Sequence, residues 1–331
     1  MLDPVDALIL DEAPEPAGRV LVVDAPALAR AAAERGWEVI GYADGLSEER
    51  AMTVPTVSEL TAGTLTGVDV ALLRLPKAVA ALTEYVQLLA RVPGVRLVAG
   101  GRVKHMTRSM NEALATRFTE VRASLGRQKS RVLHAGGPRP GAIDFPRQQR
   151  HSDLDLVLAA HGHTFSGTRI DPGTRLLLGV LDRLREGPVV DLGSGNGVLS
   201  VLLAGRDREV VAVDESRAAC LSTAASARLN EVEVEVRRED GLSGFGDGTL
   251  DLVVCNPPFH TGPAKDSRPA LAMIDDAARA LRPDGELWLV WNAHLPYLPR
   301  LRYAIGRTTI EARNPKFIVT RSIKLPEPVE G

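Results

Sequence analysis

The segment "VVDLGSGNGVLSVLLA", residues 189 to 204, limits the folds open to this 331-residue chain. An apolar run that suits a buried strand leads into three glycines at alternate positions, and a second apolar run with helical spacing follows them. Glycine permits positive φ and lets a ligand approach the backbone closely. A strand that turns into a helix through such a loop is typical of open α/β sheets, which bind ligands at the carboxyl ends of their parallel strands.

Strand-like and helix-like patterns alternate along the rest of the chain in two series. The first series has strand-like runs at 18–24, 37–44, 68–77 and 95–101. The second continues after the glycine loop, with strand-like runs at 208–216, 232–241, 250–259 and 285–292 and helical patterns at 217–229 and 269–282. Two short alternating segments, "TTIEA" and "FIVTRSIKL", follow near the end. We predict an α/β protein with two tandem Rossmann-like domains, the second built on a mostly parallel seven-stranded sheet that ends in an antiparallel pair.

A segment between the two series has the composition of a linker or of an exposed crossing segment. Residues 134 to 151, "HAGGPRPGAIDFPRQQRH", are rich in glycine, proline and charge. We therefore predict an N-terminal domain over residues 1–150 and a C-terminal domain over residues 151–331.

The two halves share a spacing of acidic residues. Asp24 and Asp191 each end a strand-like run, and Asp44 and Asp214 end the next runs, 20 and 23 residues later. The first half reads "VVDAPALA" where the second reads "VVDLGSGNG". We interpret the first half as a degenerate copy of the second that has lost its cofactor loop. Unrelated α/β domains can share such spacing as well, so this second explanation stays open.

Composition excludes several classes of protein. The chain is 44% apolar with a formal net charge of -2, which argues against a histone-like binder of nucleic acid. Cys220 and Cys255 lie in apolar runs and lack metal-ligand spacing. No apolar run approaches the ~20 residues that cross a bilayer, and the N-terminus is acidic where a signal peptide is basic. We expect a soluble cytoplasmic monomer with no metal and no membrane contact.

The glycine loop differs from the loops that bind a pyrophosphate. Gly193, Gly195 and Gly197 follow a G-x-G-x-G pattern that begins from Asp191, whereas dinucleotide folds use G-x-G-x-x-G. An aspartate at the mouth of the loop would repel a pyrophosphate and attract an ammonium or sulfonium group. We therefore expect a ligand that presents a positive charge there.

Two further carboxylates follow the next strands of the series. Asp214 ends the second strand and is placed to accept hydrogen bonds from ribose hydroxyls, and Asp240 follows the third strand, from which it could accept from an adenine amino group. Singly, such residues are more often helix caps or surface charges. Their common position at the ends of successive strands favours a nucleoside site.

The fourth strand of this series ends in "CNPPFH", residues 255 to 260. Proline has no N–H and a fixed φ, so the pair after Asn256 stiffens the turn and leaves it rich in hydrogen-bond acceptors. The Asn256 side-chain oxygen and the Pro257 carbonyl can both accept from the amine of a planar base, while Phe259 offers a face for stacking. Such an amine is a weak nucleophile, and two acceptors on its hydrogens aim its lone pair at an electrophile. An ordinary loop between strand and helix is the alternative interpretation.

In chain order, "FSGTRIDPGTRLLL", "VDLGSGNGVLSV", "VDES", "CNPPFH", "NAHLPY" and "NPKFIVTRSIKL" resemble class I S-adenosylmethionine-dependent methyltransferases, and more narrowly the bacterial ribosomal RNA guanine-N2 methyltransferases. "LRLPK" at 73–77 and "RVKHMT" at 102–107 are similar to the large-subunit type, which we favour over the small-subunit type. The resemblance implies methylation of a guanine N2 in 23S, or next 16S, ribosomal RNA, as free RNA or in a subunit. It also implies an N-terminal domain that is a decayed methyltransferase copy and that binds or positions RNA.

The same resemblance implies roles for single residues. Phe165 and Ser166, in "HTFSG", match a segment expected to cover the methionine end of the cofactor. Asn256, Pro257 and Phe259 would hold the target guanine. The implied cofactor-binding residues are Phe165, Ser166, Asp191, Gly193, Ser194, Gly195, Asn196, Gly197, Asp214, Asp240 and Asn256. The family often has Cys in place of Ser194, and both side chains are small.

Local charge agrees with an RNA partner. Residues 91–150 hold 13 Lys or Arg against 3 Asp or Glu, and residues 300–324 hold seven against Glu311 alone. Two basic segments suit a phosphate backbone, although charge runs are often only solvated faces. We expect His260 and His294 to be positioning or loop residues, since this chemistry needs no strong base. Lys316 and Phe317 could approach the base or the RNA.

Other functions stay compatible with the motifs. Asn-Pro-Pro-aromatic segments also serve methylation of adenine N6 and of protein glutamine, although Tyr is commoner than Phe in those cases. A catalytically silent RNA-binding protein that keeps the fold is the alternative from another class. The intact glycine loop and the intact "NPPF" at 256–259 argue against it.

Overall fold

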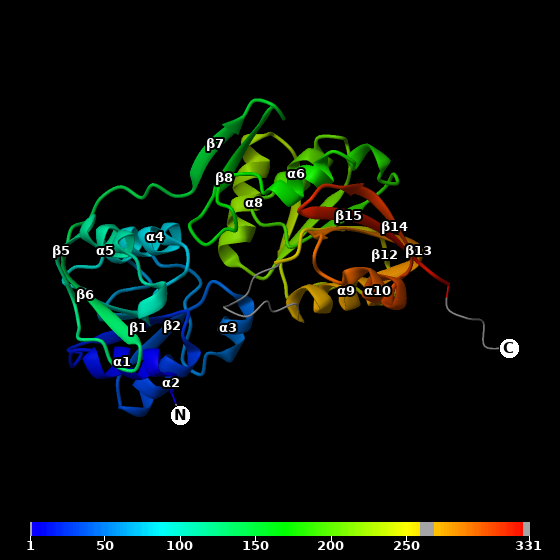
Figure 1. Ribbon diagram of the computed structural model, residues 1–331. Helices are drawn as coiled ribbons and strands as arrows, with labels where there is room; N and C mark the ends of the chain where they lie inside the picture. Colours follow the sequence, from blue (N-terminus) through cyan, green and yellow to red (C-terminus); the bar gives the residue numbers. More distant parts are fainter. Residues whose placement is uncertain (1, 259–267, 327–331) are drawn as a thin grey trace. The chain divides into compact units, whose positions relative to one another are not determined.

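The computed structural model describes residues 2–258 and 268–326. Phe259 and His260 therefore lie outside the described residues. Contacts between Cα atoms divide the chain into two compact units, shown as ribbons in Figure 1. The first unit comprises Met1–Phe145 with His161–His163, and the second comprises Pro146–Ala160 with Thr164–Gly331.

The first unit alternates helices and strands and then closes with an antiparallel pair. Its elements are α1 (Pro4–Glu12), β1 (Arg19–Val23), α2 (Pro26–Glu34), β2 (Val39–Tyr42), α3 (Leu46–Ala51), β3 (Val68–Arg74), α4 (Val79–Leu89), β4 (Arg96–Arg102), the 3-10 turn η1 (Val103–His105), α5 (Arg108–Ala115), β5 (Phe118–Ala123) and β6 (Ser130–Pro138). The six strands form one sheet in the order β2-β1-β3-β4-β6-β5. Strands β1 to β4 pair in parallel, and β6 runs antiparallel to both β4 and β5.

Helices cover both faces of this first sheet. One core cluster joins Leu82 of α4 and Leu114 of α5 to strand residues such as Leu73. A separate cluster joins Ile9 of α1 and Leu28 of α2 to the other face. Figure 1 shows the resulting three layers, with α4 and α5 on one side and α1 and α2 on the other. Burial on both faces explains why β1 and β3 read as continuous apolar runs rather than alternating ones.

The second unit begins with a two-stranded hairpin and then builds a larger sheet. Its elements are β7 (Arg147–His151), β8 (Leu156–Ala160), α6 (Pro172–Leu178), η2 (Leu181–Arg183), β9 (Val189–Leu192), α7 (Val198–Ala204), β10 (Val210–Asp214), α8 (Arg217–Leu229), β11 (Glu235–Arg238), β12 (Leu250–Cys255), α9 (Arg268–Ala280), β13 (Leu281–Asn292), α10 (Tyr297–Ala304), β14 (Gly306–Arg313) and β15 (Phe317–Lys324). The seven-stranded sheet has the order β11-β10-β9-β12-β13-β15-β14. Its first five strands are parallel, and β15 is antiparallel to β13 and to β14.

This sheet is also covered on both faces. Ile274 of α9 and Leu301 of α10 belong to one core cluster, and Leu177 of α6 and Leu199 of α7 belong to another. The predicted mostly parallel seven-stranded sheet with a terminal antiparallel pair is therefore confirmed. Strands β9, β10 and β12 are direct neighbours, so their carboxyl ends meet at one edge of the sheet.

The two sheets have the same topology except at one edge. Aligning β1 with β9, β2 with β10 and β3 with β12 brings the remaining strands into the same order, and the described part of the first sheet lacks a counterpart of β11. An isolated parallel bridge between Gly41 and Thr56 lies where that counterpart would pair. The prediction of two tandem Rossmann-like domains, with the first one degenerate, is confirmed at the level of the fold.

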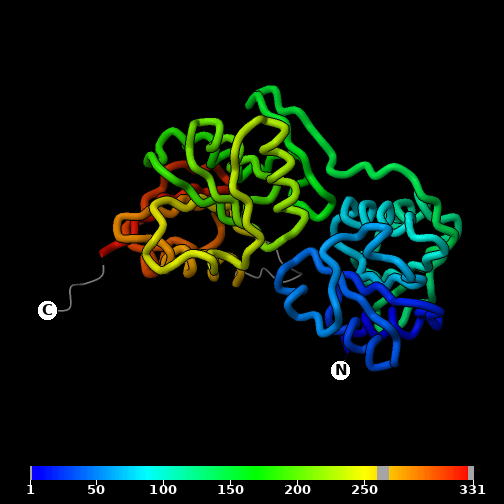
Figure 2. Tube along the Cα trace, turned by 180° about the vertical axis from the view of Figure 1, so that it is seen from behind, coloured from blue at the N-terminus to red at the C-terminus, as the bar shows by residue number. Residues whose placement is uncertain are grey.

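The prediction of a linker over residues 134–151 is wrong at both ends. Residues 134–138 are the end of β6, which pairs with the buried strand β4, and 147–151 are β7, which pairs with β8. Glycine and proline at the end of β6 hide its strand pattern, and β7 is an almost wholly exposed polar strand. β6 pairs with β4, which lies about 30 residues earlier in the chain, whereas β7 forms a hairpin with the strand that follows it. Figure 2 follows the chain through this region, drawn in green.

Helix α1 and strand β5 were also not predicted. The acidic N-terminal segment forms a helix because Asp3 caps it, accepting from the Val5 N–H, and because Pro4 suits the first turn. Strand β5 exposes most of its residues at the sheet edge, so it carries little apolar signal. Searching the described residues for a helix long and apolar enough to cross a bilayer finds none.

Candidate active site

The glycine loop connects β9 to α7 and is hydrogen-bonded to the end of the neighbouring strand β10. The Gly193 N–H donates to the Val213 carbonyl at 2.8 Å, and the Gly195 N–H donates to Asp214 Oδ2 at 3.0 Å. Gly193, Gly195 and Gly197 have φ of 77°, 58° and 78°, a region that favours glycine. No atom of the described residues lies within 4 Å of where a Cβ on Gly195 would be, so the loop presents an open backbone surface at that point.

Asp191 lies beneath the loop and is fully buried, which corrects its expected position at the loop mouth. Its Oδ2 accepts from the Ser200 N–H at 3.1 Å and from the Ser200 hydroxyl at 2.6 Å. Its Oδ1 is buried without a hydrogen-bond partner among the described residues. Burial raises the pKa of Asp191 to about 6, and the hydrogen bonds from Ser200 oppose the rise.

Ser194 and Asn196 use their side chains inside the protein. Ser194 Oγ lies 3.1 Å from the Thr223 hydroxyl of α8. Asn196 Nδ2 donates to the carbonyls of Gly167 and Arg169 at 2.9 and 3.1 Å. The amide of Asn196 therefore binds the 164–169 segment to the glycine loop.

The 164–169 segment forms two turns beside the loop. Gly167 N–H donates to the Thr164 carbonyl and Arg169 N–H to that of Ser166, at 3.0 and 3.1 Å. Ser166 adopts a φ of 60°. The Phe165 side chain is 66% exposed. An aromatic ring left in water beside an open glycine loop is available to cover a ligand.

The two outer carboxylates follow neighbouring strands of the sheet. Asp214 ends β10, and its two oxygens accept from the N–H groups of Gly195 and Ser216. Asp240 lies two residues beyond β11 and is exposed. Because β9, β10 and β11 are adjacent and parallel, the predicted cofactor residues share one edge of the sheet.

Asn256 follows β12 at the same edge and has a fixed orientation. Its Nδ2 donates to Thr174 Oγ1 at 2.7 Å and to Asp171 Oδ2 at 3.3 Å. A carboxylate only accepts, so these partners establish which side-chain atom of Asn256 is the nitrogen. The Asn256 Oδ1 is buried and has no partner among the described residues. Pro257 is buried next to it.

Asp171 and Thr174 contact Asn256, and the sequence alone did not assign either of them to the candidate site. Asp171 caps α6, accepting from the N–H groups of Gly173 and Thr174, and the same carboxylate contacts Asn256. The segment "DPGT" reads as an ordinary helix start, which is why no second role was assigned to it. Its position within the quoted "FSGTRIDPGTRLLL" was the available signal.

Some of the other predicted site residues lie outside the described part of the chain, and the rest lie near the turns around β15. Phe259 and His260 are outside the described residues. His294 and Lys316 are exposed on adjoining turns, where the Ala293 N–H donates to the Lys316 carbonyl at 2.8 Å. Phe317 packs against the first turn of α6. A Cβ added to Gly173 of that turn would lie 3.1 Å from the Phe317 ring.

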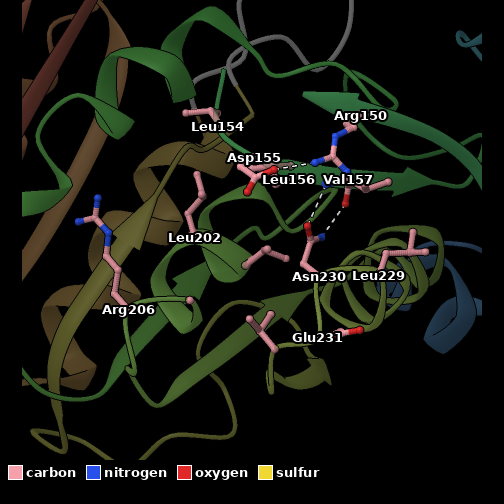
Figure 3. A pocket seen from close by; sticks show the side chains of 13 residues that line it. Arg150, Leu154, Asp155, Leu156, Val157, Leu202, Arg206, Leu229, Asn230 and Glu231 are labelled. Carbon is pink, nitrogen blue, oxygen red and sulfur yellow. Dashed lines mark hydrogen bonds and ion pairs between the residues drawn. The ribbon is translucent and has the colours of Figure 1, made fainter. Parts of the chain in front are cut away.

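A separate hollow of about 480 Å³ lies away from these residues. Figure 3 shows that the β7–β8 hairpin, the last parts of α7 and α8 and the residues that follow these helices line it, with Asn230 hydrogen-bonded to the backbone of Val157. The ends of α7 and α8 precede β10 and β11, which places the hollow at the opposite edge of the sheet from the glycine loop. Within the described part of the chain, no group of three or more His, Cys, Asp or Glu is arranged to hold a metal.

Comparison with known protein families gives two matches. The methyltransferase small domain matches residues 155–321, and the RLMG N-terminal domain matches residues 42–138. A solved structure, the T. thermophilus 16S rRNA N2 G1207 methyltransferase (RsmC) in complex with AdoMet and guanosine, shares the fold with a TM-score of 0.80 and 22% identity, over 97% of this chain and 92% of that one.

Relatives of closer sequence carry one common name. The ribosomal RNA large subunit methyltransferase G of Streptomyces coelicolor is 39% identical, and the match covers 78% of this chain and 72% of the relative. The protein of the same name from Stutzerimonas stutzeri is 36% identical, over 77% of this chain and 71% of the relative. Because these relatives are more than 30% identical over more than two thirds of both chains, the chain belongs to the ribosomal RNA large subunit methyltransferase G family.

Proposed function

We propose that this protein transfers a methyl group from S-adenosylmethionine to the exocyclic N2 amine of a guanine in large-subunit ribosomal RNA. The observation that carries the proposal is the Asn256 side chain. Its nitrogen is bound by Thr174 and Asp171, while its Oδ1 is buried and has no partner among the described residues. A buried acceptor without a donor is costly, so its retention indicates a ligand that supplies one.

An exocyclic amine on a purine is the donor that suits this acceptor. The amine carries two hydrogens, which the Asn256 oxygen and the Pro257 carbonyl can accept. Holding both hydrogens draws the nitrogen lone pair out of conjugation and directs it away from the acceptors. No residue needs to act as a strong base, because the methylated amine loses its extra proton readily. Positioning alone is then the main contribution of these residues to the rate.

The residues at the glycine loop fit S-adenosylmethionine. The open surface over Gly195 accommodates a ligand against the backbone, and the unpartnered Asp191 Oδ1 is, among the described residues, a buried acceptor close to the loop. We assign the loop and Asp191 to the methionine end, Asp214 to the ribose and Asp240 to the adenine. The cofactor supplies an electrophilic methyl group on a sulfonium. Phe165 and Ser166 cover that end of the site and exclude water.

Unpaired cations on both units suit an RNA backbone. Several exposed cations of the first unit form no ion pair or hydrogen bond with the described residues, among them Lys104, Arg122, Lys129 and Arg131. The same holds in the second unit for Arg302, Arg307, Arg313 and Lys316. We assign the N-terminal domain, over residues 1–150, to binding and positioning RNA, and residues 151–331 to catalysis. The enzyme acts in the cytoplasm as a monomer.

The deciding experiment follows labelled methyl groups from S-adenosylmethionine into ribosomal RNA from a strain that lacks the gene, with mapping of the modified base. We expect label on N2 of one guanine of 23S RNA. Label on adenine or in protein would overturn the assignment of the target. Absence of cofactor binding in calorimetry would favour the silent RNA-binding protein instead.

Two variants test the role of Asn256. Asn256→Ala is expected to abolish transfer while cofactor affinity stays near that of the wild type, because the side chain acts on the base. Thr174→Val keeps the shape but removes one of the two acceptors that orient Asn256, so we expect about a 10- to 100-fold lower kcat. Thr53→Val, at an exposed position of the first unit, is the matched control. Equal loss of cofactor binding in Asn256→Ala would make its role structural.

A further inference from the structure

Three residues from the middle of the second unit's sequence belong to the first unit. His161–His163 follow β8 directly, yet their contacts group them with Met1–Phe145. Helix α4 binds them through Glu84, whose Oε1 accepts from His161 Nδ1 at 2.6 Å and whose Oε2 accepts from the Gly162 N–H at 2.6 Å. The Glu84 side chain is only 12% exposed, so both hydrogen bonds are shielded from water. A carboxylate that uses both oxygens on one short segment holds that segment firmly.

Gly162 leaves no room between this segment and α4. A Cβ at that position would lie 2.4 Å from the Ala80 carbonyl oxygen and 2.7 Å from Ala81 Cα. Both are helix backbone atoms, which cannot rotate away as a side chain could. The segment therefore lies directly against the backbone of α4, and glycine is required there for packing rather than for its φ.

His163 reaches the edge of the first sheet that corresponds to the cofactor edge of the second. Its Nε2 lies 3.7 Å from Asp24 Oδ2 and its Nδ1 lies 3.7 Å from Asp44 Oδ2. Its ring centroid is 5.1 Å from that of Tyr85. By strand order, Asp24 and Asp44 take the places of Asp191 and Asp214. A side chain of the chain itself thus occupies the edge where such sheets bind ligands.

The carboxylates around His163 are organised by the fold. Asp24 Oδ1 accepts from the Asp44 N–H at 2.8 Å, and Asp24 Oδ2 accepts from the Tyr85 hydroxyl at 2.7 Å. Asp24 has a φ of 52°, which is uncommon for a residue other than glycine. Burial raises the pKa of Asp24, and the nearby His163 opposes the rise. The first unit therefore maintains a strained, desolvated acidic site that accommodates an imidazole.

The next residues of the same segment are bound to the second unit. The Thr164 hydroxyl lies 2.7 Å from the Ser222 hydroxyl of α8, and Asn196 of the glycine loop donates to the Gly167 carbonyl. Phe165 lies between these contacts, two residues from His163. The cover assigned to the cofactor is therefore anchored on its N-terminal side by the first unit and on its C-terminal side by the glycine loop.

We propose that Glu84, Gly162 and His163 are positioning residues for methyl transfer, through which the degenerate first unit fixes the cofactor cover of the second. The inference rests on the proposed function, because it takes Phe165 and Ser166 to cover the cofactor. A segment held at both ends loses less conformational entropy when a ligand orders it. Releasing the first anchor then weakens cofactor binding without changing the reacting groups.

The test compares variants of the full chain by calorimetric Kd for S-adenosylmethionine and by steady-state methylation of ribosomal RNA. Glu84→Ala and Gly162→Ala are expected to raise the Kd and the KM for the cofactor about tenfold, with kcat at saturating cofactor changed less than about twofold. Glu84→Gln retains one acceptor for the Gly162 N–H, so its effect should be intermediate. Glu34→Gln and Gly63→Ala are the controls, since Glu34 is exposed and a Cβ on Gly63 would contact only Thr61 Oγ1 among the described residues, at 3.8 Å.

The outcomes separate the inference from the function on which it rests. A cofactor KM that stays at the wild-type value in Glu84→Ala and Gly162→Ala would overturn the inference, while an active wild type would leave the proposed function intact. A fall in kcat and Tm together, with no selective change in cofactor KM, would make these residues merely structural and would also overturn it. If the wild-type protein bound no S-adenosylmethionine, the proposed function itself would be refuted.

Discussion

At the level of single residues, Asn256 and Asp191 each have a buried oxygen atom without a hydrogen-bond partner among the described residues, and the active site that we propose is built around these two atoms. Asn256 Oδ1 is directed by hydrogen bonds on its own nitrogen, and Asp191 Oδ1 is directed by the bonds that Ser200 makes to the other oxygen. Each side chain is satisfied on one side and available to a ligand on the other. Leaving such groups unpaired costs about 1–3 kcal/mol each, which a ligand recovers on binding.

The ionisation of Asp191 predicts a pH dependence of stability. Its pKa rises to about 6 in the folded chain from an ordinary 3.8, so between these values the folded state holds a proton that the unfolded state has lost. Stability therefore falls as the pH rises through this window. Between pH 4 and pH 7 we expect the unfolding free energy of the wild type to drop by about 2 kcal/mol relative to Asp191→Asn.

Urea unfolding without cofactor at the two pH values measures this difference. In a Trp37→Phe background, fluorescence reports Trp288 and Trp291, which are both buried in the second unit. Parallel pH profiles for the wild type and the Asp191→Asn variant would show that the carboxyl group is already ionised at low pH. The comparison of slopes removes any constant effect of the substitution itself.

The glycine loop shows how one element separates stability from binding. Gly197 is the N-cap residue directly before α7 and has a φ of 78°, and a Cβ there would lie 2.9 Å from Thr223 Cα on α8. Gly195 has a φ of 58° but faces open space among the described residues. Helix packing and a positive φ therefore both favour glycine at 197, whereas at 195 only the positive φ does so.

Alanine at position 197 should mainly lower folding stability, whereas alanine at position 195 should mainly lower cofactor affinity. Gly197→Ala combines a left-handed conformation with a backbone clash, so we expect a loss of about 3 kcal/mol in stability. Gly195→Ala carries only the conformational cost, about 1 kcal/mol, but places a methyl group on the cofactor surface. Chemical unfolding should show the larger loss of stability in Gly197→Ala. Calorimetry with S-adenosylmethionine should show that Gly195→Ala loses more cofactor affinity relative to its loss of stability. The reverse ranking would contradict the assignment of this surface.

Across the whole molecule, exposed cations without partners among the described residues lie on both units. In the first unit, Lys129 ends the turn between β5 and β6 and Arg131 lies at the start of β6, while their neighbour Arg127 is paired with Asp11. Binding of RNA phosphates releases counterions, and the salt dependence of the affinity counts the phosphates that are neutralised. Cations with and without an acidic partner in this region should therefore contribute differently to the salt dependence of RNA binding.

Replacing Lys129 and Arg131 by Ala should weaken binding to a ribosomal RNA fragment. The slope of log Kd against log salt should shrink by about 0.7 for each phosphate that the two side chains neutralise in the wild type. Arg127→Ala is the matched control, because its charge is already partnered by Asp11. Fluorescence anisotropy over a salt series gives the slopes. An equal change in slope for the control and the double variant would place the RNA elsewhere.

Local sequence determined much of this protein. The glycine loop, the apolar strands buried on both faces and the "NPP" turn at Asn256 each depend on neighbouring residues, through φ preference and side-chain period. These patterns were sufficient for the seven-stranded sheet, the duplicated domain and the sheet edge on which Asp191, Asp214 and Asn256 lie. Strands β5 and β7 were not predicted, because exposed strands carry little apolar signal, and the end of β6 was not predicted because of its glycine and proline residues.

Only the tertiary structure decided how the site residues are held. Thr174 orients Asn256 from 82 residues away, and Tyr85 binds Asp24 across 61 residues. His163 joins the first unit although it follows a strand of the second. Such contacts depend on chain folding rather than on local preference, since a hydroxyl, a carboxylate or an imidazole has no sequence period that reveals its partner. The sequence therefore determined which chemical groups reach the sheet edge, and the packing of distant helices decided which of their atoms are left available for ligands.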